Sequence, residues 1–165
     1  MFTTTRNDGY TISTDPDRLD LDLVHTWLCT EAYWALGRDR ETVALAFAGS
    51  IGFGVYHPQD GRQVAVARVI TDRATFAYLC DVYVDRAERG RGLGTWLAGA
   101  VRDQLAELGV RRIVLATNDA HGVYEKIGFS PVQADRWMEF DRRDPVVNPV
   151  TSKDPPADRA PTVQA

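Results

Sequence analysis

Residues 84–96 read VDRAERGRGLGTW, a run in which Gly90, Gly92 and Gly94 occur at every second position. An apolar, strand-like run precedes these glycines and a helix-like run follows them. Glycine lets backbone amides approach an anion closely, and a helix that begins here adds its own N–H groups and dipole. The stretch therefore predicts a phosphate-binding turn between a strand and a helix.

Two familiar phosphate motifs are excluded by the spacing of these glycines. The dinucleotide fingerprint G-x-G-x-x-G would have to end at Thr95 or Leu97, and neither is glycine. The Walker motif needs a Gly-Lys pair followed by Ser or Thr, which this chain lacks. What remains is R-x-x-G-x-G from Arg89 to Gly94, which aims successive N–H groups at one point and suits a pyrophosphate. A loop that uses glycine only for close packing is the alternative.

The rest of the chain predicts an α/β (α+β) domain with a mixed, mostly antiparallel sheet of about seven strands, flanked by about four helices. The expected order is β-α-α-β-β-β-α-β-α-β-β, which has too few crossover helices for a doubly wound parallel sheet. Expected strands cover residues 10–13, 51–56, 63–71, 75–84, 112–117, 129–132 and 136–140. Expected helices begin near Leu19, run over 40–49 and 93–108, and extend from a cap at Asn118 or Asp119 to Gly128, with Gly109 ending the third helix.

Length and composition predict one domain over residues 1–141. A chain of 165 residues can bury a substantial core without disulfides or metals. After Asp141 the chain has five prolines, many polar residues and no aromatic residue, so residues 142–165 are expected to form a flexible, Pro-rich tail. The N-terminus lacks the apolar stretch of a secretory signal, and no run is long and apolar enough to span a bilayer. We therefore expect a cytoplasmic protein without a membrane partner.

Charge and metal-ligating residues exclude further classes. The formal net charge of −4 argues against a nucleic-acid partner, because such binding depends on clustered Lys and Arg. The two cysteines, Cys29 and Cys80, have no C-x-x-C spacing, and His25, His57 and His121 are scattered along the chain. We therefore expect reduced cysteines and no metal site.

Two motifs resemble those of one known superfamily. The run VDRAERGRGLGTWL resembles motif A of the GNAT superfamily of acetyl-CoA-dependent N-acetyltransferases, whose signature is [QR]-x-x-G-x-[GA] after the fourth strand. The later run TNDAHGVYEKIGF resembles the second signature, in which an alanine, three residues and a tyrosine precede a Gly-Phe pair: here Ala120, Tyr124, Gly128 and Phe129. The motifs stand in the right order, and the expected elements match from about residue 10 to residue 141.

The resemblance implies acetyl-CoA as the cofactor. Its pantetheine arm would pair with main chain at Val82 and Val84, in a gap between the fourth and fifth strands, and the Val82 N–H would face the thioester oxygen. Thr117 stands where the superfamily often has an asparagine, with Asn118 beside it, so the contact at that end stays open. The residues expected at the cofactor are Val82, Tyr83, Val84, Arg89, Gly90, Arg91, Gly92, Leu93, Gly94, Thr95, Thr117, Asn118 and Tyr124.

Three residues are expected to serve the chemistry. By resemblance, Tyr124 is the acid that protonates the departing thiolate, with packing on the core as its alternative. An alkyl amine with a pKa near 10.4 is neutral in about one molecule per 10³ at pH 7, so a base or a water relay is also needed. Asp81 is the leading base because it interrupts an apolar strand; an ion pair with neighbouring arginines is the equal alternative. His121 lies three residues before Tyr124 and is the expected orienting or relay group, with a helix cap as its alternative.

The acceptor side is expected to hold Trp27, Tyr33, Trp34 and Asp81, although aromatic residues in such a helix pair also form core. If Tyr33 and Trp34 face the substrate, they favour an apolar or aromatic amine, or a cation over a ring face.

The preferred function is direct transfer of an acetyl group to a small-molecule amine acceptor in a ternary complex. A protein or peptide N-acetyltransferase and a non-catalytic acyl-CoA sensor are the alternatives, and a homodimer is a further expectation from how common dimers are in such folds.

Overall fold

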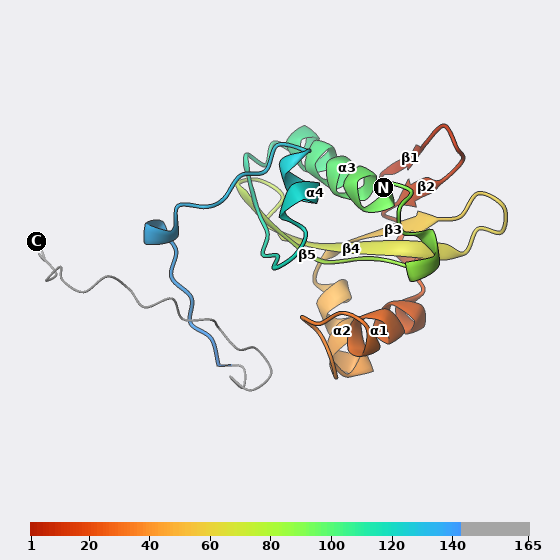
Figure 1. The fold of residues 1–165 in the computed structure, drawn as a ribbon, viewed down its shortest axis with the longest axis horizontal. Coiled ribbons are helices and arrows are strands. Elements are labelled where there is room, and N and C mark those ends of the chain that lie inside the picture. The colour runs from red at the N-terminus through yellow and green to blue at the C-terminus, as the bar shows by residue number, and fades with distance from the viewer. Residues whose placement is uncertain (143–165) are drawn as a thin grey trace, which may run out of the picture. The chain divides into compact units, whose positions relative to one another are not determined.

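The computed structural model describes residues 1–142 of the 165-residue chain, so the expected tail lies almost entirely outside the described residues. Figure 1 shows the elements. The strands are β1 Thr3–Thr5, β2 Thr11–Ser13, β3 Ile51–Tyr56, β4 Gln63–Thr71, β5 Phe76–Val84 and β6 Arg112–Val114. The α-helices are α1 Leu21–Thr30, α2 Arg40–Ala48, α3 Leu93–Glu107 and α4 His121–Glu125; short 3₁₀ turns span Pro16–Arg18, Arg86–Glu88 and Ala134–Arg136.

The six strands form one sheet in chain order, from β1 at one edge to β6 at the other. Every neighbouring pair is antiparallel except β5 and β6, which run parallel because α3 crosses over between them. The predicted fold class, a mixed and mostly antiparallel sheet with four helices, is confirmed, with six strands in residues 1–142 instead of about seven.

Capping residues set where the helices begin and end. The Asp20 carboxylate accepts from the N–H groups of Asp22 and Leu23, so α1 begins after the position expected from its apolar residues. Asp39 caps α2 in the same way through the Thr42 N–H. Gly109, at φ 86°, follows the end of α3, which confirms its predicted role, because a left-handed residue after a helix favours glycine.

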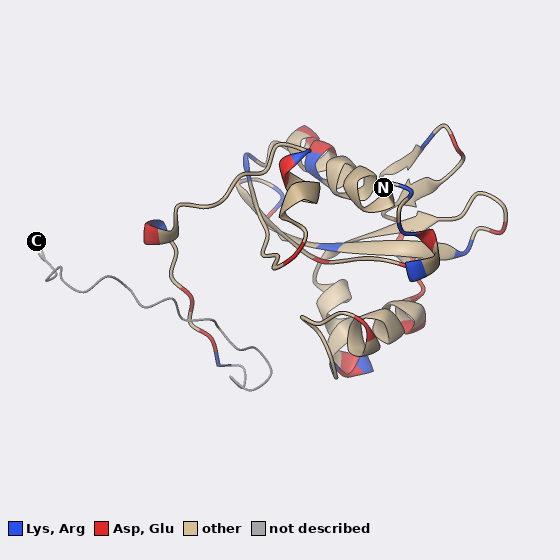
Figure 2. Cartoon of the chain, in the orientation of Figure 1, with Lys and Arg blue, Asp and Glu red and all other residues tan. Residues whose placement is uncertain are grey.

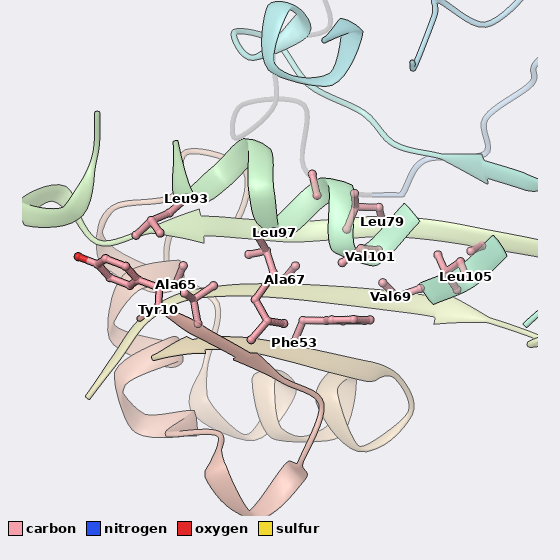
Figure 3. Close-up of a cluster of buried hydrophobic side chains, with 14 of the residues drawn as sticks. Tyr10, Phe53, Ala65, Ala67, Val69, Leu79, Leu93, Leu97, Val101 and Leu105 are labelled. Carbon is pink, nitrogen blue, oxygen red and sulfur yellow. The ribbon is translucent and has the colours of Figure 1, made fainter. Parts of the chain in front are cut away.

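Two apolar clusters lie on opposite faces of the sheet. Helix α3 covers one face with Leu93, Leu97, Val101 and Leu105 packed on inward residues of β3, β4 and β5 (Figure 3). Helices α1 and α2 cover the other face (Figure 1), where Val24, Leu28, Val43 and Phe47 form the second cluster. The sheet is therefore buried on both sides along its central strands, as their long apolar runs require.

The sequence-based prediction fails at both ends of the sheet. Strand β1 was not expected, and β6 ends at Val114 instead of residue 117. The predicted strands at 129–132 and 136–140 are absent from the described residues. Pro131 has no N–H to donate to a strand ladder, which disfavours a strand over the first of these segments. The cap of α4 is Ala120, not Asn118 or Asp119.

Residues 1–131 form one compact unit, and the domain boundary predicted at residue 141 stays a prediction. None of the described helices is both long and apolar enough to cross a bilayer. Within residues 1–142, no group of three or more His, Cys, Asp or Glu side chains could hold a metal ion. Acidic and basic residues are interspersed along the helices and loops (Figure 2).

Candidate active site

A β-bulge in β5 shapes the centre of the candidate site. Val66 of β4 pairs with Tyr83, but Arg68 pairs with Cys80, so Asp81 and Val82 together face Ala67. Asp81 has φ 48°, a left-handed value that is uncommon for a residue with a side chain. The extra residue reverses the faces of the strand, because side chains alternate with a period of two. Ala77 and Leu79 pack towards α3 before the bulge, and Val82 and Val84 do so after it.

The edge of β5 beyond the bulge is open on the β6 side. The two strands pair only from Phe76 to Tyr78. The Asp85 N–H bonds to Val64 O at 2.9 Å, and bonded residues alternate along an antiparallel pair, so Tyr83 also faces β4. The main-chain groups of Val82 and Val84 therefore point away from β4, towards the side where β6 diverges. The main-chain contacts of Val82 and Val84 with a cofactor stay a prediction.

The glycine turn lies next to this open edge. Gly90 and Gly92 have φ 80° and 72°, and a Cβ at either would meet no atom within 4 Å. Gly92 begins α3 and supplies no side-chain cap, and the first bonded N–H of the helix is that of Trp96. The N–H groups of Leu93, Gly94 and Thr95 are therefore available at the helix N-terminus, where an anion is stabilised by the dipole.

The arginines of the turn are tied to neighbouring groups. Arg89 Nε donates to Val84 O at 3.0 Å, and its guanidinium carbon lies 5.2 Å from the centroid of the Tyr83 ring. Arg91 Nε lies 3.3 Å from a Glu88 carboxylate oxygen, and Arg91 O accepts from Arg6 at 3.1 Å. The turn thus carries two guanidinium groups beside the open helix end, a composition that suits a polyanionic ligand.

Glu88 is a buried acid beside the glycine turn that the sequence analysis did not single out. Only 4 % of it is exposed, and Tyr10 Oη donates to its carboxylate at 2.6 Å. Arg62 also donates to it, from the β3–β4 hairpin. The hydrogen bond from Tyr10 holds the pKa of Glu88 below its usual range. Glu88 therefore ties the chain just before Arg89 to two other parts of the fold. Its position between Arg86 and Arg89 was the sequence feature that could have indicated an ion-paired acid here.

Asp81 forms ion pairs with two arginines from other elements. Arg68 Nε donates to Asp81 Oδ2 at 2.6 Å, and Arg38 Nη1 lies 3.1 Å and 3.2 Å from the two carboxylate oxygens. The Asp81 side chain is 2 % exposed. The structure thus shows the alternative that the sequence left open for Asp81, an ion pair with neighbouring arginines. Both oxygens of the carboxylate take part in it.

Two of the predicted site residues lie behind the site. Trp27 is 3 % exposed and stacks on Tyr83, with ring centroids 5.3 Å apart, so it is core and cannot contact an acceptor. The Tyr83 main chain faces β4, and its Oη donates to Glu31 at 2.6 Å. Tyr83 therefore supports Arg89 through its ring and has no main-chain group on the open edge.

The connection between α1 and α2 reaches across to the loop after β6. Tyr33 Oη accepts from the Asn118 N–H at 3.1 Å and donates to Asp119 at 3.5 Å. Trp34 packs edge-to-face on Tyr33 at 4.9 Å, and its buried Nε1 has no hydrogen-bond partner within the described part of the chain. Tyr33 therefore reaches the loop after β6, whereas Trp34 packs behind it against the cluster formed by α1 and α2.

Tyr124 lies on α4 beside this bridge. Its ring packs on Phe129 at 5.9 Å, and burial, with smaller effects of Tyr33 and Asp119, raises the pKa of Tyr124 to about 12. His121 is exposed at the first residue of α4. Thr117 Oγ1 accepts from the Ala120 N–H at 3.1 Å and so shapes the turn before α4. The structure brings Tyr33, Asn118 and Tyr124 together, although they are far apart in the sequence.

Comparisons with known proteins agree on one family. The profile of the Acetyltransferase (GNAT) family matches residues 14–129. A Gibberella zeae protein named "Putative acetyltransferase FG08082" is 33 % identical over 141 residues, which cover 74 % of this chain and 78 % of that protein. A crystal structure from Xanthomonas campestris, of a protein placed in the same family, is 42 % identical with a TM-score of 0.75, covering 84 % of this chain and 95 % of that one.

A more distant structure shows the fold alone. It is that of a Clostridium acetobutylicum protein crystallised with acetyl-CoA, 16 % identical with a TM-score of 0.62, and the match covers 85 % of this chain and 96 % of that one.

Proposed function

The chain belongs to the GNAT acetyltransferase family, and from this premise we propose that it transfers an acetyl group from acetyl-CoA to the amine of a small molecule. The observation that carries the proposal is the uncapped N-terminus of α3 behind Gly90 and Gly92, placed beside the open edge of β5. A distant structural neighbour crystallised with acetyl-CoA supports the choice of cofactor.

The residues present fit coenzyme A. A pyrophosphate needs several N–H donors and positive charge at one point, which Leu93, Gly94 and Thr95 supply together with Arg89 and Arg91. A pantetheine arm needs main-chain partners, which Val82 and Val84 supply on the open side of β5. Bound there, acetyl-CoA supplies an acetyl group activated as a thioester.

The residues of the chain then have to position the two substrates and protonate the departing sulfur. In the transfer, a C–N bond forms to the acceptor nitrogen, the C–S bond breaks, the nitrogen loses a proton and the sulfur gains one. We assign the donation to sulfur to Tyr124, whose raised pKa keeps its phenol protonated across the physiological range. Because a phenol with this pKa is a weak acid, Tyr124 acts chiefly as a hydrogen-bond donor to the developing thiolate.

The proton from the amine needs another acceptor. Asp81 is a poor base here because both of its oxygens are held by arginine. We assign to Asp81 the role of holding the bulge that orients the Val82 N–H, where it can stabilise charge on the acetyl oxygen. His121, three residues from Tyr124 and exposed, is the titratable group that we propose for relaying the proton.

Direct transfer is favoured over an acetyl-cysteine intermediate. Burial raises the pKa of the Cys80 thiol to about 11, so the nucleophilic thiolate is scarce at neutral pH. The Cys80 thiol also donates to Arg68 O at 3.4 Å, behind the bulge.

A small acceptor is favoured over a peptide because Tyr33 bridges the α1–α2 connection and the β6–α4 loop, which would have to separate to admit a polypeptide.

Titration calorimetry with acetyl-CoA, with ATP and NADH as controls, tests the proposal. We expect micromolar binding of acetyl-CoA alone, about −8 kcal/mol. Tyr124→Phe should bind acetyl-CoA as the wild type does and turn over amines about 10²-fold more slowly. No binding of acetyl-CoA would refute the proposal, whereas binding with equal turnover by Tyr124→Phe would remove Tyr124 from the chemistry. Binding without turnover of any amine would favour an acyl-CoA sensor.

A further inference from the structure

The charge of the cluster around Asp81 is not balanced. It contains one carboxylate, Asp81, and two guanidinium groups, Arg38 and Arg68, so its formal charge is positive by one. The side chains of Asp81 and Arg68 are 2 % and 11 % exposed, whereas that of Arg38 is 25 % exposed. The uncompensated charge therefore lies on the side of the cluster that solvent and small molecules can reach.

Arg68 donates from two of its guanidinium nitrogens, whereas Arg38 donates from one. Arg68 donates from Nε to Asp81 and from Nη1 to Ser50 Oγ at 3.1 Å, and its guanidinium lies over the Phe47 ring. Arg38 uses Nη1 alone for both Asp81 oxygens. Its Nε and Nη2 have no partner among residues 1–142, although guanidinium offers five N–H donors.

Nearby carboxylates are committed elsewhere. Glu31 accepts from Tyr83 and pairs with Arg86. Asp39, the next residue after Arg38, accepts from the Thr42 N–H and hydroxyl at the start of α2. Neither carboxylate pairs with Arg38, so the free donors of Arg38 are available to an anion from outside the chain.

Arg38 also stands beside the proposed reaction point. Its partner Asp81 precedes Val82, whose main chain faces the open edge of β5. Arg38 belongs to the α1–α2 connection, the segment from which Tyr33 reaches Asn118 on the far side of the gap. An acceptor held between Val82 and Tyr124 would therefore have Arg38 on its α1–α2 side.

We propose that the acceptor is an amine that also carries a carboxylate, as an amino acid does, and that Arg38 binds this carboxylate. A planar carboxylate matches two parallel N–H donors of one guanidinium, which Nε and Nη2 provide. This inference rests on the proposed acetyl transfer and specifies the acceptor of the same site.

The test compares matched acceptors and matched variants. Each amino acid of a panel is assayed beside the amine that lacks only its carboxylate, such as phenylalanine beside phenethylamine. The variant is Arg38→Gln, which leaves Asp81 and Arg68 as a balanced pair and so should fold. The control is Arg40→Gln, which removes a nearby arginine that pairs with the exposed Asp22. Arg38→Lys keeps the charge but loses the planar pair of donors.

We expect the wild type to acetylate at least one amino acid with a kcat/KM about 10-fold or more above its matched amine. Arg38→Gln should lower kcat/KM for that amino acid about 10- to 100-fold, mainly through KM, as loss of a charge-assisted hydrogen bond would. The loss should be at least about 10-fold greater for the amino acid than for its matched amine, because only the amino acid carries the carboxylate that Arg38 binds, and acetyl-CoA affinity should stay within about 2-fold. Arg38→Lys should fall between Arg38→Gln and the wild type, and Arg40→Gln should match the wild type.

Two results would overturn the inference: no turnover of any amino acid in the panel, whether or not the matched amines react, or equal losses for both members of a pair in Arg38→Gln. The last would mean that Arg38 only holds the α1–α2 connection. Acetyl-CoA binding, measured separately on each protein, distinguishes these results from failure of the proposed transfer itself. Thermal unfolding of Arg38→Gln shows whether a loss of activity reflects loss of the fold.

Discussion

Glu88 is a buried acid directly before the turn that we propose to bind a phosphate, where an unpaired negative charge would be unfavourable. Glu88 would repel a pyrophosphate if its charge were free, but Arg62 and Arg91 both lie against its carboxylate and Tyr10 donates to it. Arg62 is shared with Asp60 and Asp85, at 3.4 Å and 3.9 Å, so it does not neutralise Glu88 alone. Glu88 therefore fixes the start of the turn through Tyr10, Arg62 and Arg91, and its pairing with Arg91 holds that guanidinium beside the turn.

Glu88→Gln should weaken both the fold and the cofactor site. Glutamine keeps the shape but loses the charge that pairs with Arg62, so we expect a loss of about 1–3 kcal/mol in the free energy of unfolding at neutral pH. Acetyl-CoA affinity should fall about 10-fold, because the turn is less well held. Arg73→Gln, at an exposed turn between β4 and β5, is the control and should change neither quantity.

The same variant gives a pH signature with a defined sign. The folded pKa of Glu88 is depressed, chiefly by the hydrogen bond from Tyr10. Its stabilisation is therefore complete above the ordinary pKa of glutamate, about 4.3, and is lost as the pH falls through the folded value. The difference between wild type and Glu88→Gln in chemical denaturation should shrink below about pH 4.5. A difference independent of pH would show that the carboxylate charge contributes nothing.

At the scale of elements, α3 joins the two halves of the cofactor site, and its glycines allow a matched comparison. Gly92 at the start of the helix has φ 72°, and Gly109 after its end has φ 86°; a Cβ at either would meet no atom within 4 Å. Alanine at either position thus costs backbone strain without a clash, about 1–2 kcal/mol. Only Gly92 lies at the proposed pyrophosphate site.

Gly92→Ala and Gly109→Ala should therefore lower the melting temperature by similar amounts but differ in cofactor binding. We expect acetyl-CoA affinity to fall about 10-fold or more in Gly92→Ala, because relief of the strain redirects the N–H groups of the turn, and to stay unchanged in Gly109→Ala. Calorimetric titration of both proteins measures the effect. Equal affinity in both variants would place the anion site elsewhere.

The long elements could be predicted from sequence because their signals are local. Strand β4 matches its predicted range of 63–71, and α3 was predicted from its glycine turn and from Gly109. Strand β1 has three residues, too few for a periodic signal. The segments at 129–132 and 136–140 have apolar residues but do not form strands in the described structure. Strand formation depends on the surrounding sheet as well as on the residues of the segment.

The residues of the candidate site likewise fall into those that local sequence motifs predict and those that only the fold brings together. The glycine turn and Tyr124 lie in contiguous motifs and were predicted. The partners of Asp81 lie 43 and 13 positions away in the sequence, and Tyr10 lies 78 positions from Glu88. No pattern in one sequence links residues at such separations, so ion pairs of this kind emerge only from the fold.

At the scale of the whole molecule, the bulge in β5 connects two faces with different tasks. The α3 face holds the turn and the helix end that we assign to the cofactor. The α1–α2 face holds Arg38 and Tyr33, which we assign to the acceptor. Because the bulge reverses the strand, Asp81 reaches the second face directly before Val82 presents its main chain to the gap. The one inserted residue of the bulge therefore places the proposed cofactor contact at Val82 next to Asp81, which holds Arg38 on the proposed acceptor side.

The stability of the whole molecule should depend on buried phenols at high pH. Tyr56 is 4 % exposed, and its hydroxyl has no hydrogen-bond partner within residues 1–142. Burial raises the pKa of Tyr56 to about 12, above the ordinary value of about 10. Below pH 10 the phenol is neutral in both states; as the pH rises towards 12 the unfolded chain ionises first, so the fold loses up to about 2 kcal/mol. Burial also raises the pKa of Tyr124 to about 12 and that of Cys80 to about 11, so the share of Tyr56 in the alkaline loss is measured with a variant.

Tyr56→Phe removes the hydroxyl and keeps the ring, so it isolates the effect of the hydroxyl on stability. Removing an unpartnered buried hydroxyl breaks no hydrogen bond, so at neutral pH we expect stability to stay equal or to rise by about 1 kcal/mol. Between about pH 10 and 12 the variant should lose less stability than the wild type, by denaturant titration at each pH. Tyr10→Phe is the matched control, because Tyr10 Oη donates to Glu88 and its loss should destabilise the protein at neutral pH. If both variants were equally destabilised at neutral pH, the Tyr56 hydroxyl would have a partner in solution, and the alkaline loss would have to be assigned to another tyrosine.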